Sequence, residues 1–129
     1  MSVARIIIAD DDELIVDMVR SVLEKCGHIV GALPDGNAVR DVLEFKQPDL
    51  LILDCGMPGK DGLAALREVR NSAKSYNIPV LMLTGRVADS DEWIAYQAGA
   101  DDYLRKPFDP DQLVVRVDAL LNPPARRGA

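Results

Sequence analysis

Residues 50–58 read Leu50-Leu51-Ile52-Leu53-Asp54-Cys55-Gly56-Met57-Pro58, four consecutive apolar residues followed by an acid and a turn. A strand that is apolar at consecutive positions has both of its faces covered, as in a parallel sheet flanked by helices. The stretch therefore predicts a buried strand over Leu50–Leu53, with the carboxylate of Asp54 at its carboxyl end.

Similar apolar runs bounded by turn residues occur at four other places: Arg5–Ala9, His28–Leu33, Val80–Leu83 and Asp102–Leu104. Between the runs, apolar residues recur at helical spacing, and the clearest helical stripe ends at Gly27, a typical helix C-cap. Five strands alternating with five helices predict an α/β fold, a flavodoxin-like doubly wound parallel sheet in the order 2-1-3-4-5. The second and fifth runs are the weakest and suit edge strands.

The length of the chain, 129 residues, fits one domain. We expect a folded domain over residues 1–121, and a free tail or the start of a linker over residues 122–129, which contain prolines and arginines. The net charge of −6 argues against binding of nucleic acid or of an anionic membrane by this chain, because both need a basic surface.

Three further features favour a cytoplasmic protein. The two cysteines, Cys26 and Cys55, lack a CxxC spacing and are typical of reduced thiols. The amino-terminal residues contain no signal-peptide pattern. The apolar runs of four or five residues are too short to span a membrane.

Polar side chains follow the predicted strands where each strand ends. Asp10 and Asp11 follow the first strand, Asp54 the third, Thr84 the fourth and Lys106 the fifth. In an open parallel sheet, ligands bind beyond the carboxyl ends of the strands, at the point where the strand order reverses. We therefore expect the three acids to converge in one crevice, with Thr84 and Lys106 beside them.

Such a cluster of carboxylates needs positive charge, because three carboxylates close together repel one another. Lys106 supplies one positive charge, and a divalent cation would neutralise the remaining two negative charges. Mg²⁺ suits the site, since it prefers oxygen ligands and is typically held by one or two carboxylates together with phosphate oxygens. A carboxylate can also act as the nucleophile of phosphoryl transfer and form an aspartyl phosphate.

Four segments of the chain, taken together, resemble the receiver domains (CheY-like) of response regulators in two-component signalling. The resemblance covers about residues 4 to 121 and depends on four segments, each at a strand end: Ile8–Asp12, Leu51–Gly62, Leu81–Gly85 and Ala98–Phe108.

The resemblance implies a role for each matching residue. Asp54 is similar to the phosphoacceptor, and Asp10, Asp11, Asp54 and the backbone carbonyl of Gly56 are similar to the ligands of Mg²⁺. Asp11 matches the acid that binds the ion directly, and Asp10 the one that acts partly through water. Lys106 matches the lysine that binds the phosphate.

The resemblance also implies a switch, in which Thr84 is similar to the switch hydroxyl and Tyr103 to the aromatic residue that turns inward on activation. The peptide bond before Pro107 is cis in this family. The chain departs from the family at Gly56, where bulkier residues are common. Together with Arg86, Gly56 occupies the positions that tune the lifetime of the aspartyl phosphate.

Members of this family are signalling phosphoacceptors, whose only chemistry is their own phosphorylation and dephosphorylation. They accept the phosphoryl group from a histidine kinase or a histidine phosphotransfer protein, and then control a downstream output. The stretch Leu113–Val117, with Asp101, resembles receivers that form homodimers through the fourth helix, fifth strand and fifth helix. Two possibilities stay open: a stand-alone regulator, or part of a longer protein with an effector domain.

Three alternatives fit the sequence less well. A Mg²⁺-dependent phosphatase with an aspartyl phosphate typically has a second acid two residues after the nucleophile, where this chain has Gly56. A flavin mononucleotide carrier needs a neutral loop after the first strand, and Asp10-Asp11-Asp12 would repel the flavin phosphate. A degenerate receiver that serves only for docking would not need the complete set of site residues.

Simpler roles fit several other polar residues. Asp12 and Asp61 precede predicted helices, where an aspartate typically caps the first turn. His28, the only histidine, stands apart from the acids and is expected to be structural.

Overall fold

A computed structural model describes residues 3–85 and 89–123 of the chain. Its centre is a parallel sheet of five strands in the order β2-β1-β3-β4-β5, as the sequence predicted. The strands are β1 (Arg5–Ala9), β2 (Ile29–Leu33), β3 (Leu50–Asp54), β4 (Val80–Thr84) and β5 (Asp102–Arg105).

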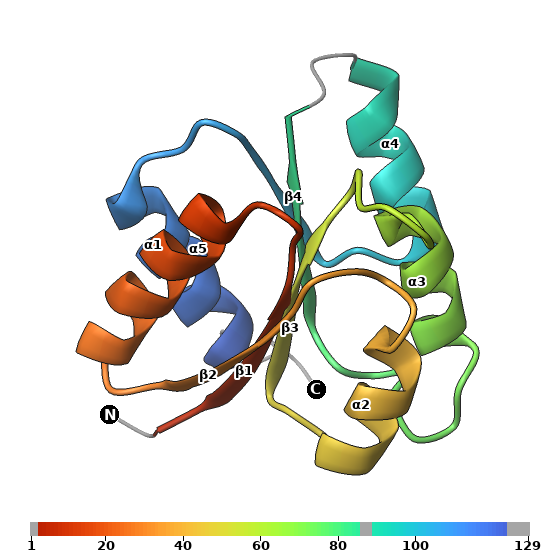
Figure 1. Ribbon diagram of the computed structural model, residues 1–129, viewed down its shortest axis with the longest axis horizontal. Helices are drawn as coiled ribbons and strands as arrows, with labels where there is room; N and C mark the ends of the chain where they lie inside the picture. Colours follow the sequence, from red (N-terminus) through yellow and green to blue (C-terminus); the bar gives the residue numbers. More distant parts are fainter. Residues whose placement is uncertain (1–2, 86–88, 124–129) are drawn as a thin grey trace, which may run out of the picture.

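Helices cover both faces of this sheet, so the domain has three layers (Figure 1). One face carries α1 (Glu13–Lys25) and α5 (Pro110–Leu121). The other carries α2 (Val39–Lys46), α3 (Gly62–Arg70) and α4 (Asp89–Ala98). Among the described residues, none of the helices combines the length and the apolar character needed to cross a membrane.

The position of β3 in the middle of the sheet explains why its sequence is apolar at consecutive positions. All five of its residues are buried. Leu50 and Ile52 pack in the core beneath α1 and α5, whereas Leu51 and Leu53 pack in the core beneath α2, α3 and α4. Because successive side chains of a strand point to opposite faces, a strand buried on both faces needs apolar residues at every position.

The helices begin and end at residues that the sequence marks. Asp12 caps α1 by accepting hydrogen bonds from the amides of Leu14 and Ile15, and Asp61 caps α3 in the same way. Gly27 follows α1 with a φ of 94°, a conformation that favours glycine. These contacts confirm the predicted caps.

The arginine at the end of α3 connects four parts of the chain near the amino ends of β4 and β5. The guanidinium of Arg70 donates to the carbonyl oxygens of Gly99, Tyr76 and Ile78, at 2.9, 2.9 and 2.6 Å. It also contacts the carboxylate of Asp101 at 2.8 Å. Arg70 therefore fixes the end of α4 and the start of β5 to α3.

Replacing Arg70 with methionine removes these contacts while keeping the apolar stem of the side chain. Because each hydrogen bond to a charged group contributes about 1.5–3 kcal/mol, and part is regained from water, we expect a loss of about 2–4 kcal/mol in the free energy of unfolding. Urea denaturation followed by circular dichroism measures the loss. A change below about 1 kcal/mol would show that the contacts are not needed.

Candidate functional site

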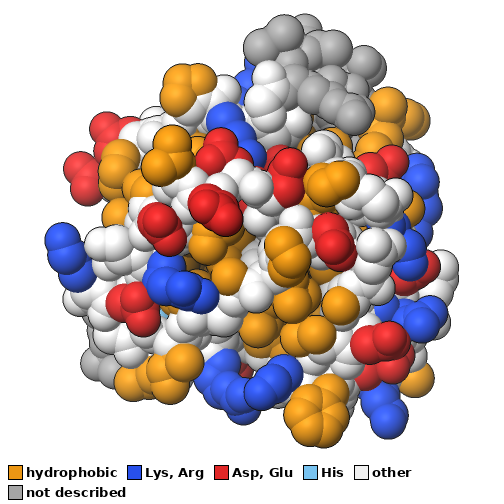
Figure 2. Space-filling view, viewed as in Figure 1, with side chains coloured by type: hydrophobic (Ala, Val, Ile, Leu, Met, Phe, Trp, Pro, Cys, Tyr) orange, Lys and Arg blue, Asp and Glu red, His pale blue; other side chains and the backbone are white. Residues whose placement is uncertain are grey.

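Three carboxylates meet at the carboxyl edge of the sheet, as the sequence predicted. Asp10 and Asp11 follow β1, Asp54 ends β3, and these two strands are neighbours in the sheet. One carboxylate oxygen from each acid lies within 4.8 Å of the others. Acidic side chains gather on this face of the molecule near the ends of the two strands (Figure 2).

The acids differ in their surroundings. Asp10 is buried, and its two oxygens accept hydrogen bonds from the ammonium of Lys106, at 2.8 Å, and from the amide of Asp12, at 2.9 Å. Asp54 is also buried, whereas Asp11 is exposed. An ion arriving from solvent therefore meets Asp11 first, while Asp10 is already engaged by the protein.

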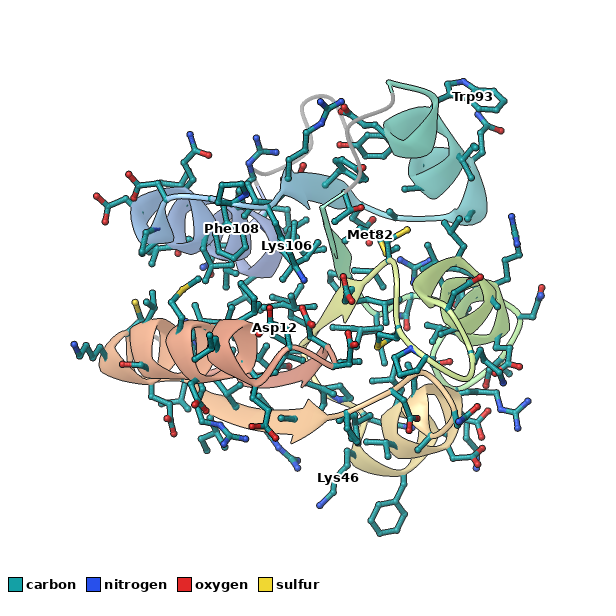
Figure 3. The ribbon with its side chains drawn as sticks, turned by 45° about the horizontal axis from the view of Figure 1, so that its top comes forward. Asp12, Lys46, Met82, Trp93, Lys106 and Phe108 are labelled. Atoms are coloured by element: carbon teal, nitrogen blue, oxygen red, sulfur yellow. The ribbon has the colours of Figure 1, made fainter. Side chains whose placement is uncertain are left out.

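The ammonium of Lys106 lies between two of the acids. Its nitrogen is 2.8 Å from Asp10 and 3.2 Å from Asp54. The amide of Lys106 donates to the carbonyl oxygen of Thr84 at 2.7 Å, which fixes the connection between β5 and α5 beside the end of β4. The Lys106–Pro107 peptide bond is cis. Figure 3 shows the lysine side chain extending towards the start of α1, where Asp12 lies.

The surroundings of Asp54 raise its pKa. Burial of the carboxylate is the largest cause, and the charge of Asp10 adds to it, while Lys106 and the amide of Gly56 oppose the shift. For Lys106, burial lowers the pKa, but the hydrogen bond and charge of Asp10 and the charge of Asp54 outweigh it and raise the pKa overall. The lysine therefore stays charged, whereas the surroundings of Asp54 disfavour its ionised form.

Replacing Asp54 with asparagine is expected to stabilise the metal-free protein at neutral pH. The pKa of Asp54 is raised in the folded state. Its ionised form therefore destabilises the fold at neutral pH, and this penalty disappears as the pH falls through the folded pKa. Thermal unfolding in EDTA should give a higher melting temperature for Asp54→Asn at neutral pH and a smaller difference in acid. A wild type that is the more stable of the two at neutral pH would contradict this.

The site fits the ligand preference of Mg²⁺. The three carboxylates provide oxygen donors close enough together to share one ion, and the exposure of Asp11 leaves a route from solvent. After the charge of Lys106 is counted, the acids retain an excess of two negative charges, which matches a divalent ion. A hollow of about 330 Å³ adjoins the site and is lined in part by Asp10, Asp11 and Pro34.

Three further residues of the predicted site lie in β4, in β5 and in the loop that follows β3. Thr84 is buried at the end of β4, and Tyr103 is buried in β5, on the side of the sheet covered by α2, α3 and α4. Gly56 is exposed, and a Cβ atom on it would meet no atom within 4 Å. Arg86 lies outside the described residues, as does most of the predicted tail at 122–129.

Asp101 and Asp102, at the amino end of β5, both form ion pairs within the domain. Asp101 binds Arg70, and Asp102 contacts Arg116 of α5 at 2.6 Å. Trp93 of α4 points outward and is 64% exposed (Figure 3).

One structural contact near the site was not predicted from the sequence. The turn between β2 and α2, at Gly36, lies directly against the backbone of Lys60 in the loop that follows β3. The only signal is the Asp35-Gly36 dipeptide, which predicts a turn but not its neighbour.

Comparisons with known proteins show the family to which this chain belongs. The profile of the response regulator receiver domain family matches residues 6–118. A protein of Chloroflexus aurantiacus that is assigned to the response regulators is 35% identical, with a TM-score of 0.88 over 93% of this chain and 98% of that one.

Two other similar structures were determined with ligands. The receiver domain of a sensor histidine kinase of Pseudomonas aeruginosa, which has a magnesium ion coordinated in its active-site cleft, is 27% identical, with a TM-score of 0.86 over 93% of this chain and 98% of that one. The BeF3-activated N-terminal receiver domain of Klebsiella pneumoniae RstA is 29% identical, with a TM-score of 0.84 over 92% of this chain and 98% of that one. This chain therefore belongs to the response regulator receiver domains, the CheY-like phosphoacceptor modules of two-component signalling.

Proposed function

We propose that this chain accepts a phosphoryl group on the carboxylate of Asp54 in a Mg²⁺-dependent reaction. One observation carries the proposal: the ammonium of Lys106 contacts both Asp10 and Asp54, beside the exposed carboxylate of Asp11. These contacts support a role of the lysine in binding a phosphoryl oxygen next to the accepting carboxylate. The remaining negative charge of the cluster is suited to a divalent ion.

The donor in this proposal is a phosphohistidine of a histidine kinase or a histidine phosphotransfer protein. A carboxylate oxygen of Asp54 attacks the phosphorus in line with the phosphorus–nitrogen bond. That bond breaks, and its electron pair stays on the imidazole nitrogen of the donor. The product is an aspartyl phosphate on this chain.

The residues around Asp54 bind the transferred group. Lys106 moves its hydrogen bond from the carboxylate of Asp54 to a phosphoryl oxygen, and the hydroxyl of Thr84 donates to another oxygen. Asp10, Asp11, Asp54 and the backbone carbonyl of Gly56 would hold Mg²⁺, which would supply charge neutralisation to the phosphoryl oxygens. Positioning and charge neutralisation are the main contributions of a protein to this reaction.

Phosphorylation then changes the conformation of the domain. Thr84 is buried at the end of β4, and Tyr103 is buried in the adjacent β5, opposite Met82. Met82 and Thr84 are two residues apart and so point to the same face of the sheet. We propose that a movement of Thr84 towards the phosphate changes the packing on this face, next to the tyrosine ring. The affected surface is formed by α4, β5 and α5, and we propose it as the output surface and the surface of a homodimer. A phosphate that binds one of two states better shifts the equilibrium between them.

Two positions control the lifetime of the phosphate in this proposal. Gly56 leaves the space beside Asp54 open, because no side chain fills it. The second position is Arg86. We further propose that the domain comprises residues 1–121 and acts in the cytoplasm.

Beryllofluoride, which mimics a phosphoryl group on aspartate, tests the proposal. With Mg²⁺ present, we expect NMR shifts of the amides of Thr84, Tyr103 and Lys106, and no such shifts in Asp54→Asn. The absence of shifts at millimolar Mg²⁺ would favour a receiver that serves only for docking. Steady release of phosphate from many phosphate esters would favour a phosphatase.

A further inference from the structure

The turn between β2 and α2, residues 34–38, packs closely against the loop between β3 and α3, residues 55–61. A Cβ atom on Gly36 would lie 2.2 Å from the carbonyl oxygen of Lys60 and 3.1 Å from its carbonyl carbon. Both are backbone atoms, so no side-chain rotation makes room for a methyl group. The φ of Gly36 lies outside the left-handed region, and a glycine is therefore needed there for space alone.

A second contact joins the same two loops, and here the glycine belongs to the loop of residues 55–61. A Cβ atom on Gly59 would lie 2.7 Å from the side-chain nitrogen of Asn37. The amide of Asn37 donates to the carboxylate of Asp35 at 2.9 Å, which shapes the turn. Each loop thus presents a glycine to the other, but only Gly36 lies against backbone atoms, which cannot rotate aside.

Other contacts fix the loop of residues 55–61 at both of its ends. The amide of Cys55 donates to the carbonyl oxygen of Leu83 at 2.9 Å. The amide of Gly62 donates to the carbonyl oxygen of Cys55 at 3.0 Å. Lys60 forms an ion pair of 2.5 Å with Glu68 of α3. Gly56 lies between these points, on the same short loop as Lys60.

On the basis of the function proposed above, we propose that Gly36 is a positioning residue of the phosphoryl site. By allowing the turn between β2 and α2 to lie against the backbone of Lys60, it sets the path of the loop that carries Gly56. It thereby sets where the carbonyl of Gly56 meets the ion. Gly36 itself contacts neither the ion nor the phosphoryl group.

Replacing Gly36 with alanine displaces the loop and tests this directly. Groups that orient metal ligands typically contribute about 10–100-fold to affinity, so we expect the dissociation constant for Mg²⁺ to rise about 10-fold in Gly36→Ala. Titration with MgCl₂, followed by NMR, measures it, and the amide of Gly56 should shift even in the metal-free protein. A folded Gly36→Ala with a dissociation constant within about twofold of the wild type would overturn the proposal.

Gly27→Ala is the matched control. It adds the same methyl group at a position with open space, and its φ of 94° makes the substitution strained. The strain should lower the melting temperature of this variant. Because Gly27 lies at the end of α1 and is not part of the site, the dissociation constant for Mg²⁺ should be unchanged. It therefore separates a general loss of stability from a displaced loop.

Removing the ion pair between Lys60 and Glu68 tests the same loop even if Gly36→Ala fails to fold. Lys60→Met and Glu68→Gln release the same contact but change the local charge in opposite directions. We expect both variants to weaken Mg²⁺ binding severalfold. Opposite changes in the two variants would show an effect of charge alone and overturn the proposal. A wild-type protein that binds no Mg²⁺ would instead contradict the proposed function.

Discussion

Replacing Lys106 with methionine is expected to slow phosphorylation of Asp54 by about 10²–10³-fold, the typical effect of removing one donor that stabilises developing charge. The ammonium lies 3.2 Å from the carboxylate of Asp54, so it is the nearest described cation to the accepting oxygens. Methionine keeps the apolar stem and removes only the charge and the hydrogen bonds. Single-turnover phosphorylation with acetyl phosphate, followed by intact mass spectrometry, measures the rate.

The same variant should lose stability when no metal is present. Lys106 is the partner of the buried carboxylates of Asp10 and Asp54, and an unpaired buried charge typically costs about 3–5 kcal/mol. Mg²⁺ should restore part of this loss. Lys46→Met is the control, because this lysine is exposed on α2 and extends away from the acids (Figure 3). A phosphorylation rate of Lys106→Met equal to that of Lys46→Met would contradict the assigned role.

Replacing Asp11 with asparagine is expected to weaken Mg²⁺ binding by about 100-fold or more, beyond the usual effect of a residue that only orients a ligand. Asp11 is the exposed acid of the cluster, and asparagine has nearly the same shape but no charge. Calorimetric titration with MgCl₂ measures the affinity. Phosphorylation should fall in parallel and recover in part at high Mg²⁺.

The neighbouring acid provides a control for charge. Asp12 is exposed, next to Asp11, and caps α1, a role that asparagine also fills. Asp12→Asn removes the same charge from the same segment, so it should change the Mg²⁺ affinity only slightly. Equal losses in the two variants would mean that the ion responds to the overall charge and is not bound by Asp11.

The sequence predicted the part of the site that depends on the ends of the strands. Consecutive apolar residues identify the buried strands, and the carboxyl ends of parallel strands share one edge, so the sequence alone is enough to bring Asp10, Asp11 and Asp54 together. The predicted strand ends were short by one residue at Asp54 and Thr84. Both residues continue the pairing of the sheet although their polar side chains interrupt the apolar pattern.

Contacts between loops could not be predicted in this way. The packing of Gly36 against Lys60, and the hydrogen bonds of Arg70 to three carbonyl groups, depend on which connections become neighbours after folding. A glycine or an arginine in a sequence carries no periodic signal that names its partner. The sequence therefore predicts the reacting groups but not the contacts that hold their loops in place.

Intact mass spectrometry of the protein incubated with acetyl phosphate and Mg²⁺ tests the central claim most directly. The wild type should gain the mass of one phosphoryl group, and the gain should be absent in EDTA and in Asp54→Asn. Beryllofluoride should block the gain. A phosphoryl adduct of equal yield in Asp54→Asn, or none in the wild type at millimolar Mg²⁺, would contradict the assignment of Asp54 as the phosphoacceptor.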